Sequence, residues 1–360
     1  MAGVAFYISG HGFGHASRQI EIARAFARLR PDVGLVLRTT APRWLFDRTL
    51  TVPFVLDDRP CDTGAIQIDS LHLDAAATIA RAKEFYETLD GRAAAEVEFL
   101  RHHDVRLVVA DAPPLGCAAA ARAGIPSVVV SNFTWDWIYA EYREYLDSAP
   151  DLIATIQAAY RQAEAAWRLP MHGGFETFPP SRHGATAGQV LIDVPFVARH
   201  ATHDPAETRA RLGLPAGRKL VLPSFGGYGV AGIDLSTLDL DPSWQVVLVP
   251  DEPIYEAGLR YEDLVRAVDV VLTKPGYGII SECVANGTAL VYTSRGRFAE
   301  YEILVREMPR YLRGAFIDND ALLGGRWRAA LEAAVSSPPP PEKPRTDGAD
   351  VIADMIAARL

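Results

Sequence analysis

The sequence predicts an α/β fold made of two doubly wound halves, each a parallel sheet with helices on both faces. Short apolar runs alternate with glycine or turn residues and then with segments of helical spacing, an order typical of parallel strands joined by crossover helices. This alternation begins near residue 4 and again near residue 219. The chain has 360 residues, which is long enough for two domains.

The first half begins with the apolar run VAFYI (residues 4–8), which predicts a strand. Residues 16–29 place apolar side chains at helical spacing and predict the first helix. A small-residue helix that ends at Gly124 is expected later in this half. The further strands expected here are residues 34–40, 105–111 and 125–132.

Between the two halves, residues 139–168 are rich in aromatic side chains and are expected to be mainly helical, with Pro150 as a break. Residues 171–184 read as a loop. Asp204 is expected to cap a short helix.

The second half repeats the alternation and ends in a separate helix. Four prolines (residues 338–341) precede this last helix, expected at residues 348–360. The segments that carry the second alternation are residues 219–229, 244–250, 261–278, 279–287 and 288–293.

Composition and net charge indicate a globular protein and argue against some classes of function. Hydrophobic residues make up 49% and charged residues 22%, which is ordinary for a globular chain. The net charge of −9 argues against non-specific binding of nucleic acid. The three cysteines (Cys61, Cys117 and Cys283) are isolated and fit a reducing compartment. With no visible signal peptide and no long apolar stretch, we expect a cytoplasmic protein without a membrane span.

Two glycine-rich turns follow expected strands, SGHGFGH (residues 9–15) and SFGGYG (residues 224–229). In open α/β sheets, ligands bind at the carboxyl ends of strands, where such turns let backbone N–H groups approach an anion. Glycines that simply make tight turns are the alternative for either loop. The first loop does not have the dinucleotide GxGxxG pattern, and no Asp or Glu is suitably placed after the second strand. The chain has no GxxxxGK[ST], so phosphoryl transfer by a P-loop is not expected.

A third stretch, TKPGYGIISE (residues 273–282), joins a strand to a helix through a glycine turn. A nucleoside diphosphate can rest on the N-terminus of such a helix, and Glu282 on its first turns can accept two ribose hydroxyls. A solvated helix acid is the alternative for Glu282.

These stretches together resemble the GT-B glycosyltransferases. TKPGYGIISE with NGTALVYTSRGRFAEYEIL (residues 286–304) is similar to their donor-binding region, and SGHGFGHASR to their opening loop, as in the peptidoglycan N-acetylglucosaminyl transferase. With NFTWDWIY (residues 132–139), they most resemble the glycosyltransferase-like N-terminal domain of plant L-arabinokinase and its stand-alone bacterial relatives. The resemblance covers about residues 4–320 and ends before the kinase domain of that protein, so sugar phosphorylation is not expected.

The resemblance implies a nucleotide-sugar donor held mainly by the second half, without a further cofactor. Leu259, Arg260 and Tyr261 match the positions that recognise the base, Glu282 the ribose-binding acid, and Glu300 the acid that meets the donor sugar. Lys274 and Arg295 can supply positive charge, although surface pairing is the alternative for both. The residues expected to lie along the diphosphate and donor sugar are Gly12, Gly14, Ser224, Gly226, Gly227, Gly229, Gly276, Tyr277 and Gly278.

On the acceptor side, His15 matches the histidine of inverting GT-B enzymes, and Asp111 the acid that orients it. A neutral imidazole can take the proton from an acceptor hydroxyl while the carboxylate fixes its tautomer. Asp111 as a strand-end cap is the alternative. His11 is a weaker candidate, which can bind phosphate, cap a helix or simply pack.

Aromatic and polar residues of NFTWDWIY are candidates for an acceptor site, because sugar and acceptor rings pack on Trp faces. Asn132 and Asp136 are the better candidates. Trp135 and Trp137 fit an acceptor wall and a helix-start core equally well.

The domains expected from this reading are residues 1–196 for the acceptor, residues 197–335 for the donor, and a helix at residues 345–360 that crosses back to the first domain. The expected reaction is inverting, metal-independent transfer of a sugar from a nucleoside diphosphate sugar to a hydroxyl or amine of an unidentified small molecule or glycan. A GT-B epimerase or hydrolase and a non-catalytic nucleotide-sugar sensor are the alternatives.

Overall fold

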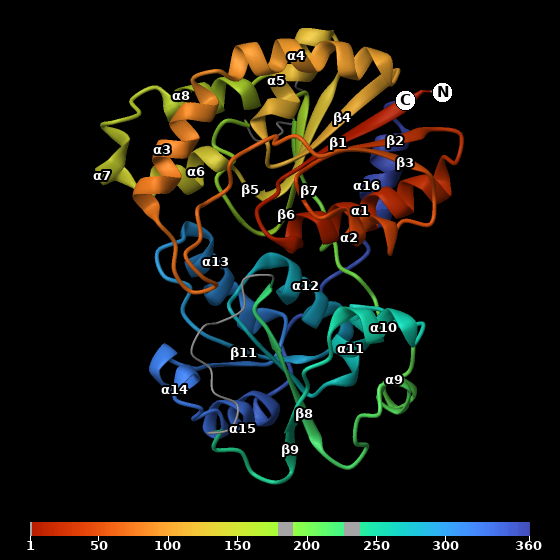
Figure 1. Cartoon of the computed structure of the whole chain (residues 1–360), viewed down its shortest axis with the longest axis vertical. Helices are drawn as coiled ribbons and strands as arrows, with labels where there is room; N and C mark the ends of the chain where they lie inside the picture. The colour runs from red at the N-terminus through yellow and green to blue at the C-terminus, as the bar shows by residue number, and fades with distance from the viewer. Residues whose placement is uncertain (1, 179–189, 227–237) are drawn as a thin grey trace.

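The computed structural model describes residues 2–178, 190–226 and 238–360. These residues form two α/β lobes, one above the other in Figure 1, with both chain ends on the upper lobe. The parallel sheets expected from the alternation are present in both lobes. In the part of the chain that is described, no helix has the length and apolarity needed to cross a membrane.

The sheet of the N-terminal lobe has seven described strands, all paired in parallel, in the order β3-β2-β1-β4-β5-β6-β7. β1 and β4 are neighbours although long segments separate them in the chain, which is the switch point of a doubly wound sheet. The strands are β1 (Gly3–Ile8), β2 (Gly34–Arg38), β3 (Phe54–Asp57), β4 (Val105–Asp111), β5 (Ser127–Phe133), β6 (Ala165–Gly173) and β7 (Val190–Asp193).

Helices cover both faces of this sheet, and β1 shows why. Its alternate side chains Val4 and Phe6 join the core cluster beneath α1, whereas Ala5 and Tyr7 join the cluster beneath α3, α4, α5 and α8. A strand buried on both faces reads as a continuous apolar run, as this one does. The helices are α1 (Phe13–Leu29), α2 (Arg43–Asp47), α3 (Ala75–Tyr86), α4 (Leu89–His102), α5 (Pro114–Ala123), α6 (Trp135–Ala140), α7 (Arg143–Leu146) and α8 (Leu152–Tyr160).

Two expectations for this lobe are wrong. The first helix begins at Phe13 rather than residue 16, so His15 lies in the first turn of a helix and not in a loop. Residues 165–168, expected to be helical, begin strand β6, which also takes residues 171–173 from the expected loop. The alanines here favour a helix locally, but pairing with both β5 and β7 outweighs that preference.

The C-terminal lobe has five described strands, all parallel, in the order β12-β11-β10-β8-β9. Asp204 caps α9 as expected, since its carboxylate accepts from the N–H groups of Ala206 and Glu207. The strands are β8 (Lys219–Ser224), β9 (Trp244–Val246), β10 (Val270–Thr273), β11 (Ala289–Tyr292) and β12 (Gly314–Phe316). The helices are α9 (Pro205–Arg211), α10 (Asp251–Glu256), α11 (Tyr261–Ala267), α12 (Tyr277–Asn286), α13 (Ala299–Glu307), η3 (Met308–Arg310), α14 (Asn319–Leu323) and α15 (Arg328–Ser336).

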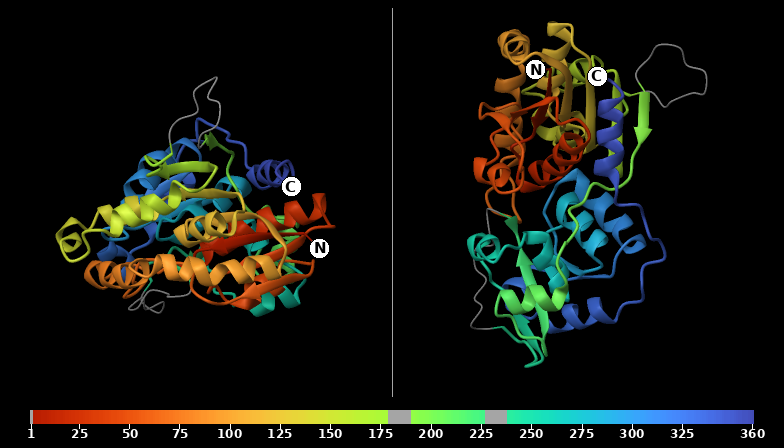
Figure 2. Two further views of the ribbon diagram at one scale, coloured as in Figure 1. Left: turned by 90° about the horizontal axis from the view of Figure 1, so that it is seen from above. Right: turned by 90° about the vertical axis from the view of Figure 1, so that its right-hand side faces the viewer.

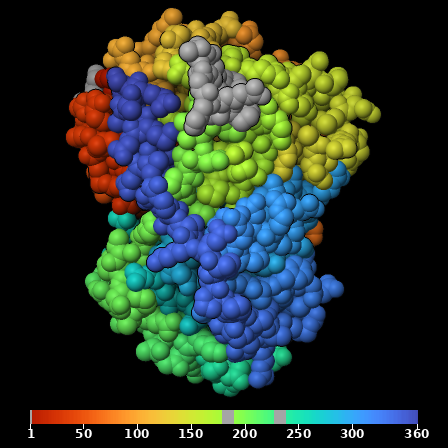
Figure 3. Space-filling model, turned by 180° about the vertical axis from the view of Figure 1, so that it is seen from behind, coloured from red at the N-terminus to blue at the C-terminus, as the bar shows by residue number. Residues whose placement is uncertain are grey.

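The last helix, α16 (Gly348–Ala357), returns to the N-terminal lobe and packs along α1. Figure 2 shows it beside α1, and Figure 3 shows the C-terminal segment rising from one lobe onto the other. Where the chain crosses back, the N–H of Gly348 donates to the carbonyl of Phe196 at 2.9 Å. The two lobes are therefore joined by two crossing segments that lie side by side.

The carboxyl ends of the central strands of both sheets face each other between the lobes. β1 and β4 end there in the upper lobe, and β8 and β10 in the lower one. Both sheets thus direct their switch points, where open α/β sheets bind ligands, toward the same space.

Candidate active site

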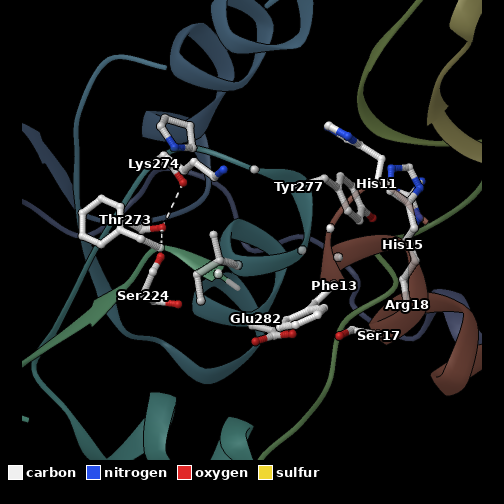
Figure 4. Close-up of a pocket in the computed structure, with 18 of the residues that line it drawn as sticks. His11, Phe13, His15, Ser17, Arg18, Ser224, Thr273, Lys274, Tyr277 and Glu282 are labelled. Carbon is white, nitrogen blue, oxygen red and sulfur yellow. Dashed lines mark hydrogen bonds between the residues drawn. The ribbon is translucent and has the colours of Figure 1, made fainter. Parts of the chain in front are cut away.

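A cavity of about 440 Å³ lies between the lobes, a size typical of small-molecule sites. Loops that follow β1, β8 and β10 line it, together with α1 and α12. Figure 4 shows His11, Phe13 and His15 on one side and Ser224, Thr273 and Lys274 on the other. The three segments singled out in the sequence therefore meet in one place.

Two helix N-termini point into this cavity. α1 begins after Gly12 and α12 begins after Gly276, and neither helix has an acidic residue in its first turn. The exposed N–H groups and dipole of a helix start favour a bound anion. Gly14 and Gly278, in these first turns, bring the two helix starts into close approach. The arrangement suits a diphosphate.

His15 and Asp111 meet as expected, with His15 Nδ1 3.0 Å from Asp111 Oδ1. His15 lines the cavity, whereas Asp111 is completely buried behind it at the end of β4. Burial by itself would raise the pKa of Asp111, but the charges of Arg18 and His15 outweigh burial and lower this pKa to about 2. Asp111 is therefore a carboxylate at any ordinary pH.

Arg18, one turn after His15 on α1, also holds Asp111. Its Nε donates to Asp111 Oδ2 at 2.7 Å, and one N–H of its NH2 group donates to Oδ1. The other NH2 proton has two groups in reach, Ser131 Oγ at 3.1 Å and His15 Nδ1 at 2.9 Å. Since Ser131 can accept that proton, His15 Nδ1–H can donate to Asp111, which leaves Nε2 as the free base.

Asn132 and Glu300 form the next contacts along the cavity wall. Asn132 Oδ1 accepts from Arg18 at 2.7 Å, and Asn132 Nδ2 donates to Glu300 Oε1 at 2.7 Å. Glu300 Oε2 accepts from Arg295 at 3.1 Å. Both ends of the Asn132 amide are thus engaged by protein groups, and Glu300 lies in the cavity wall where a donor sugar is expected.

Glu282 lies on α12 and lines the cavity, buried rather than solvated, with 4% of its surface exposed. Arg199, from the segment that joins the lobes, donates from Nε to Glu282 Oε1 at 2.7 Å. Burial raises the pKa of Glu282, and the Arg199 charge opposes that rise. Arg199 Nη1 also lies 3.5 Å from Glu262 Oε2, so the Arg199 guanidinium is paired with two carboxylates.

Lys274 follows β10 and lines the cavity with no carboxylate within ion-pair distance among the described residues. Its Nζ donates to Gln67 Oε1 of the other lobe at 3.2 Å. Burial and the neighbouring Arg295 charge lower the pKa of Lys274 to about 7. A half-buried lysine on a cavity wall, with no acid paired to it among the described residues, is a suitable partner for an anionic ligand.

Of the residues matched to base recognition, only Tyr261 reaches the cavity. Its hydroxyl lies 2.6 Å from Ser224 Oγ, and the Arg199 guanidinium lies 5.6 Å from its ring centre. Leu259 is buried in the core, and Arg260 is outside the cavity lining. Gly226 lines the cavity, while Gly227 and Gly229 lie outside the described residues.

The acceptor candidates divide into two groups. His11 lines the cavity, stacked on Phe298, and burial lowers the pKa of its imidazole well below the usual value. Trp135 and Asp136 are buried outside the cavity lining: the Trp135 indole donates to Asp62 at 2.8 Å, and Asp136 accepts from Gln157 at 3.1 Å.

Arg18, Arg199 and Gln67 are among the polar residues of the cavity wall that the sequence reasoning missed. Arg18 alone carried a usable signal, because it stands among apolar residues on the helical face that follows the glycine loop. Contacts between the lobes bring Arg199 and Gln67 to the site. The sequence around each of these residues has no motif or spacing that would indicate this position.

No protein-family model matches the chain. Among curated proteins, L-arabinokinase of Arabidopsis thaliana is 32% identical over 352 residues, which is 93% of this chain. The match covers 32% of that protein, so this chain spans about a third of the length of the curated relative. The similarity agrees with the resemblance carried by the glycine loop and the KPGYGIISE segment.

Several solved structures that match nearly the whole chain are glycosyltransferases. The glycotransferase of kitacinnamycin is 16% identical with a TM-score of 0.62, over 99% of each chain. A UDP-glucosyltransferase from Polygonum tinctorium is 14% identical with a TM-score of 0.56, over 99% of this chain and 93% of its own. At this identity the likeness establishes the fold, and it confirms the fold class expected from the sequence.

Proposed function

We propose that this chain, which has the fold of the GT-B glycosyltransferases, transfers a sugar from a nucleoside diphosphate sugar to a hydroxyl or amine of an acceptor. The observation that carries the proposal is the His15–Asp111 pair at 3.0 Å, on the wall of a cavity whose other wall is the N-terminus of α12. A base and an anion site then lie on opposite sides of one cavity, as transfer between two substrates requires.

The C-terminal lobe supplies the donor site in this proposal. The N–H groups at the start of α12 and the Lys274 ammonium take the diphosphate, while Glu282 accepts ribose hydroxyls. Glu300 accepts hydroxyls of the donor sugar. The Polygonum neighbour is named for a UDP-sugar, and a nucleoside diphosphate sugar is the donor class that these groups favour here.

The N-terminal lobe supplies the base. His15 Nε2 takes the proton of the acceptor hydroxyl while the acceptor oxygen bonds to the anomeric carbon. The bond from that carbon to the diphosphate breaks, and the nucleoside diphosphate leaves with the electron pair. Attack opposite the leaving group inverts the anomeric carbon. Asp111 stabilises the imidazolium that forms.

We propose that no metal is needed, because helix N-termini and Lys274 can stabilise the leaving diphosphate. The kinase activity in the name of the Arabidopsis relative belongs to a protein about three times as long. The cavity built from the loops after β1, β8 and β10 supports sugar transfer in this part of the fold.

A panel of UDP-, GDP-, dTDP- and ADP-sugars tests the proposal by thermal shift. The cognate donor at 100 times its dissociation constant should add about 2.7 kcal/mol to the free energy of unfolding. The same donor is then incubated with an acceptor library, and a glycosylated product is expected. Consumption of donor without acceptor would instead identify a hydrolase or epimerase, and binding without turnover a sensor.

A further inference from the structure

A buried chain of polar contacts joins the His15–Asp111 pair of one lobe to Glu300 of the other. Asp111 is held by Arg18, Arg18 donates to Asn132, and Asn132 donates to Glu300. Arg18, Asn132 and Glu300 are exposed by 4%, 0% and 5%, respectively. The contacts run from the end of β4 to the first turn of α13, which lies in the C-terminal lobe.

The two partners of Asn132 fix the direction of its amide. Its oxygen faces a guanidinium, which can only donate, and its nitrogen faces a carboxylate, which can only accept. A flipped amide would lose both hydrogen bonds. Asn132 therefore makes a bridge with a fixed polarity between a cation of one lobe and an anion of the other.

The charges along this chain are balanced while the lobes are closed. Asp111 pairs with Arg18 and Glu300 pairs with Arg295. If Glu300 moved away with its lobe, Asn132 Nδ2 would lose its acceptor, and the amide that accepts from Arg18 would be held at its oxygen end only. In a buried network, loss of one partner leaves the other unsatisfied and strongly affects its neighbours.

We infer that Arg18 and Asn132 are positioning residues that tie the His15–Asp111 pair to Glu300, so that the pair is fully ordered only when the lobes are closed. The inference rests on the proposed function, in which His15 is the base and Glu300 meets the donor sugar. Closure on the donor then orders the base on the opposite wall before the acceptor is activated.

The test follows the His15 ring without requiring turnover. Protein labelled with ¹⁵N-histidine gives ring-nitrogen and Nδ1–H signals, and His15→Ala identifies those of His15. In Glu300→Ala, exchange of the His15 Nδ1 proton with water should rise by about 2- to 30-fold, the range expected for coupling through a network. Glu300→Gln should restore the rate only in part, because its single oxygen can accept from Asn132 while its NH₂ then faces Arg295, which also donates.

Tyr7→Phe is the matched control, because Tyr7 lies on β1 of the same sheet and its buried hydroxyl donates to Glu96 of α4, outside the cavity lining. Its His15 signals should stay at their wild-type values. If Glu300→Ala does not fold, Asn132→Leu breaks the same link. Unchanged His15 exchange in either folded variant would overturn the inference.

Kinetics distinguish this inference from the proposed function. With a cognate donor and acceptor, Asn132→Leu should lower kcat by about 2- to 30-fold while the donor KM changes little. If the protein never transfers sugar but shows the expected His15 exchange, the proposed function is refuted and the coupling of Glu300 to the His15–Asp111 pair is supported. Normal transfer with an unchanged kcat in Asn132→Leu would refute the link alone.

Discussion

Gly14 and Gly278 meet across the interface between the lobes: a Cβ built on Gly278 would lie 3.1 Å from the Cα of Gly14. The two residues lie in the first turns of α1 and α12. Their contact brings both helix N-termini to one cavity, because a side chain on Gly278 would push the backbones apart.

Gly278→Ala should lower the free energy of unfolding by about 1–3 kcal/mol, because the new methyl group meets backbone. Gly14→Ala is the matched control. A Cβ there has its nearest neighbours at 3.9 Å, an ordinary contact, and alanine favours the helix by about 0.5–1 kcal/mol. Denaturant titration of both variants measures the difference, and equal stabilities would show that the lobes do not meet as described.

Glu282→Ala should weaken binding of the nucleotide sugar by roughly 1–3 kcal/mol, the scale of charged hydrogen bonds to ribose. Glu262→Gln is the control, because Glu262 also contacts Arg199 but lies outside the cavity lining. Isothermal titration gives both affinities. Wild-type affinity in folded Glu282→Ala would remove Glu282 from the donor site.

Lys274 should take up a proton when the diphosphate binds. Its pKa of about 7 in the free protein makes it mostly neutral near pH 8, and a nearby diphosphate stabilises the ammonium and raises this pKa. Binding near pH 8 should therefore consume up to about one proton, and near pH 6 much less, because Lys274 is already charged there.

Titration calorimetry in HEPES and in Tris measures this uptake, because the two buffers differ in ionisation enthalpy. Lys274→Met should bind the donor more weakly and show no uptake from this site. Identical heats in the two buffers near pH 8 for the wild type would place the diphosphate away from Lys274.

Turnover should be unchanged in excess EDTA, since the proposed leaving-group stabilisation comes from helix N-termini and cations of the protein. The assay compares initial rates before and after dialysis against the chelator. A rate that falls and then recovers on addition of magnesium or manganese would assign part of that role to a metal.

Sequence patterns predicted the parts of the site that depend on local chemistry. The glycine turns after β1, β8 and β10 mark strand ends, and parallel sheets bring those ends to one edge. His15 and Asp111 were predicted as a pair through the family resemblance, and they do meet. Glu282 lies on the first turns of α12 as expected, because its spacing from the glycine turn fixes its place on the helix.

Contacts between the lobes could not be predicted in this way. Arg199 reaches Glu282 from the connecting segment, and Gln67 reaches Lys274 from the other lobe. Neither contact follows from a periodic pattern in the sequence, because each depends on how the two sheets are placed relative to one another. The strand Ala165–Gly173 was misread for a related reason, because its partners β5 and β7 outweigh the local preference of its alanines.

The most direct test of the proposed function is the turnover of His15→Ala, measured with the donor and acceptor that the wild type uses. If His15 removes the acceptor proton, kcat should fall by about 10²- to 10⁴-fold, while donor affinity should barely change because the donor site belongs mainly to the other lobe. Asp111→Asn should lower kcat less, and the two losses should be less than additive. Product formation at the wild-type rate in His15→Ala would contradict the proposed mechanism.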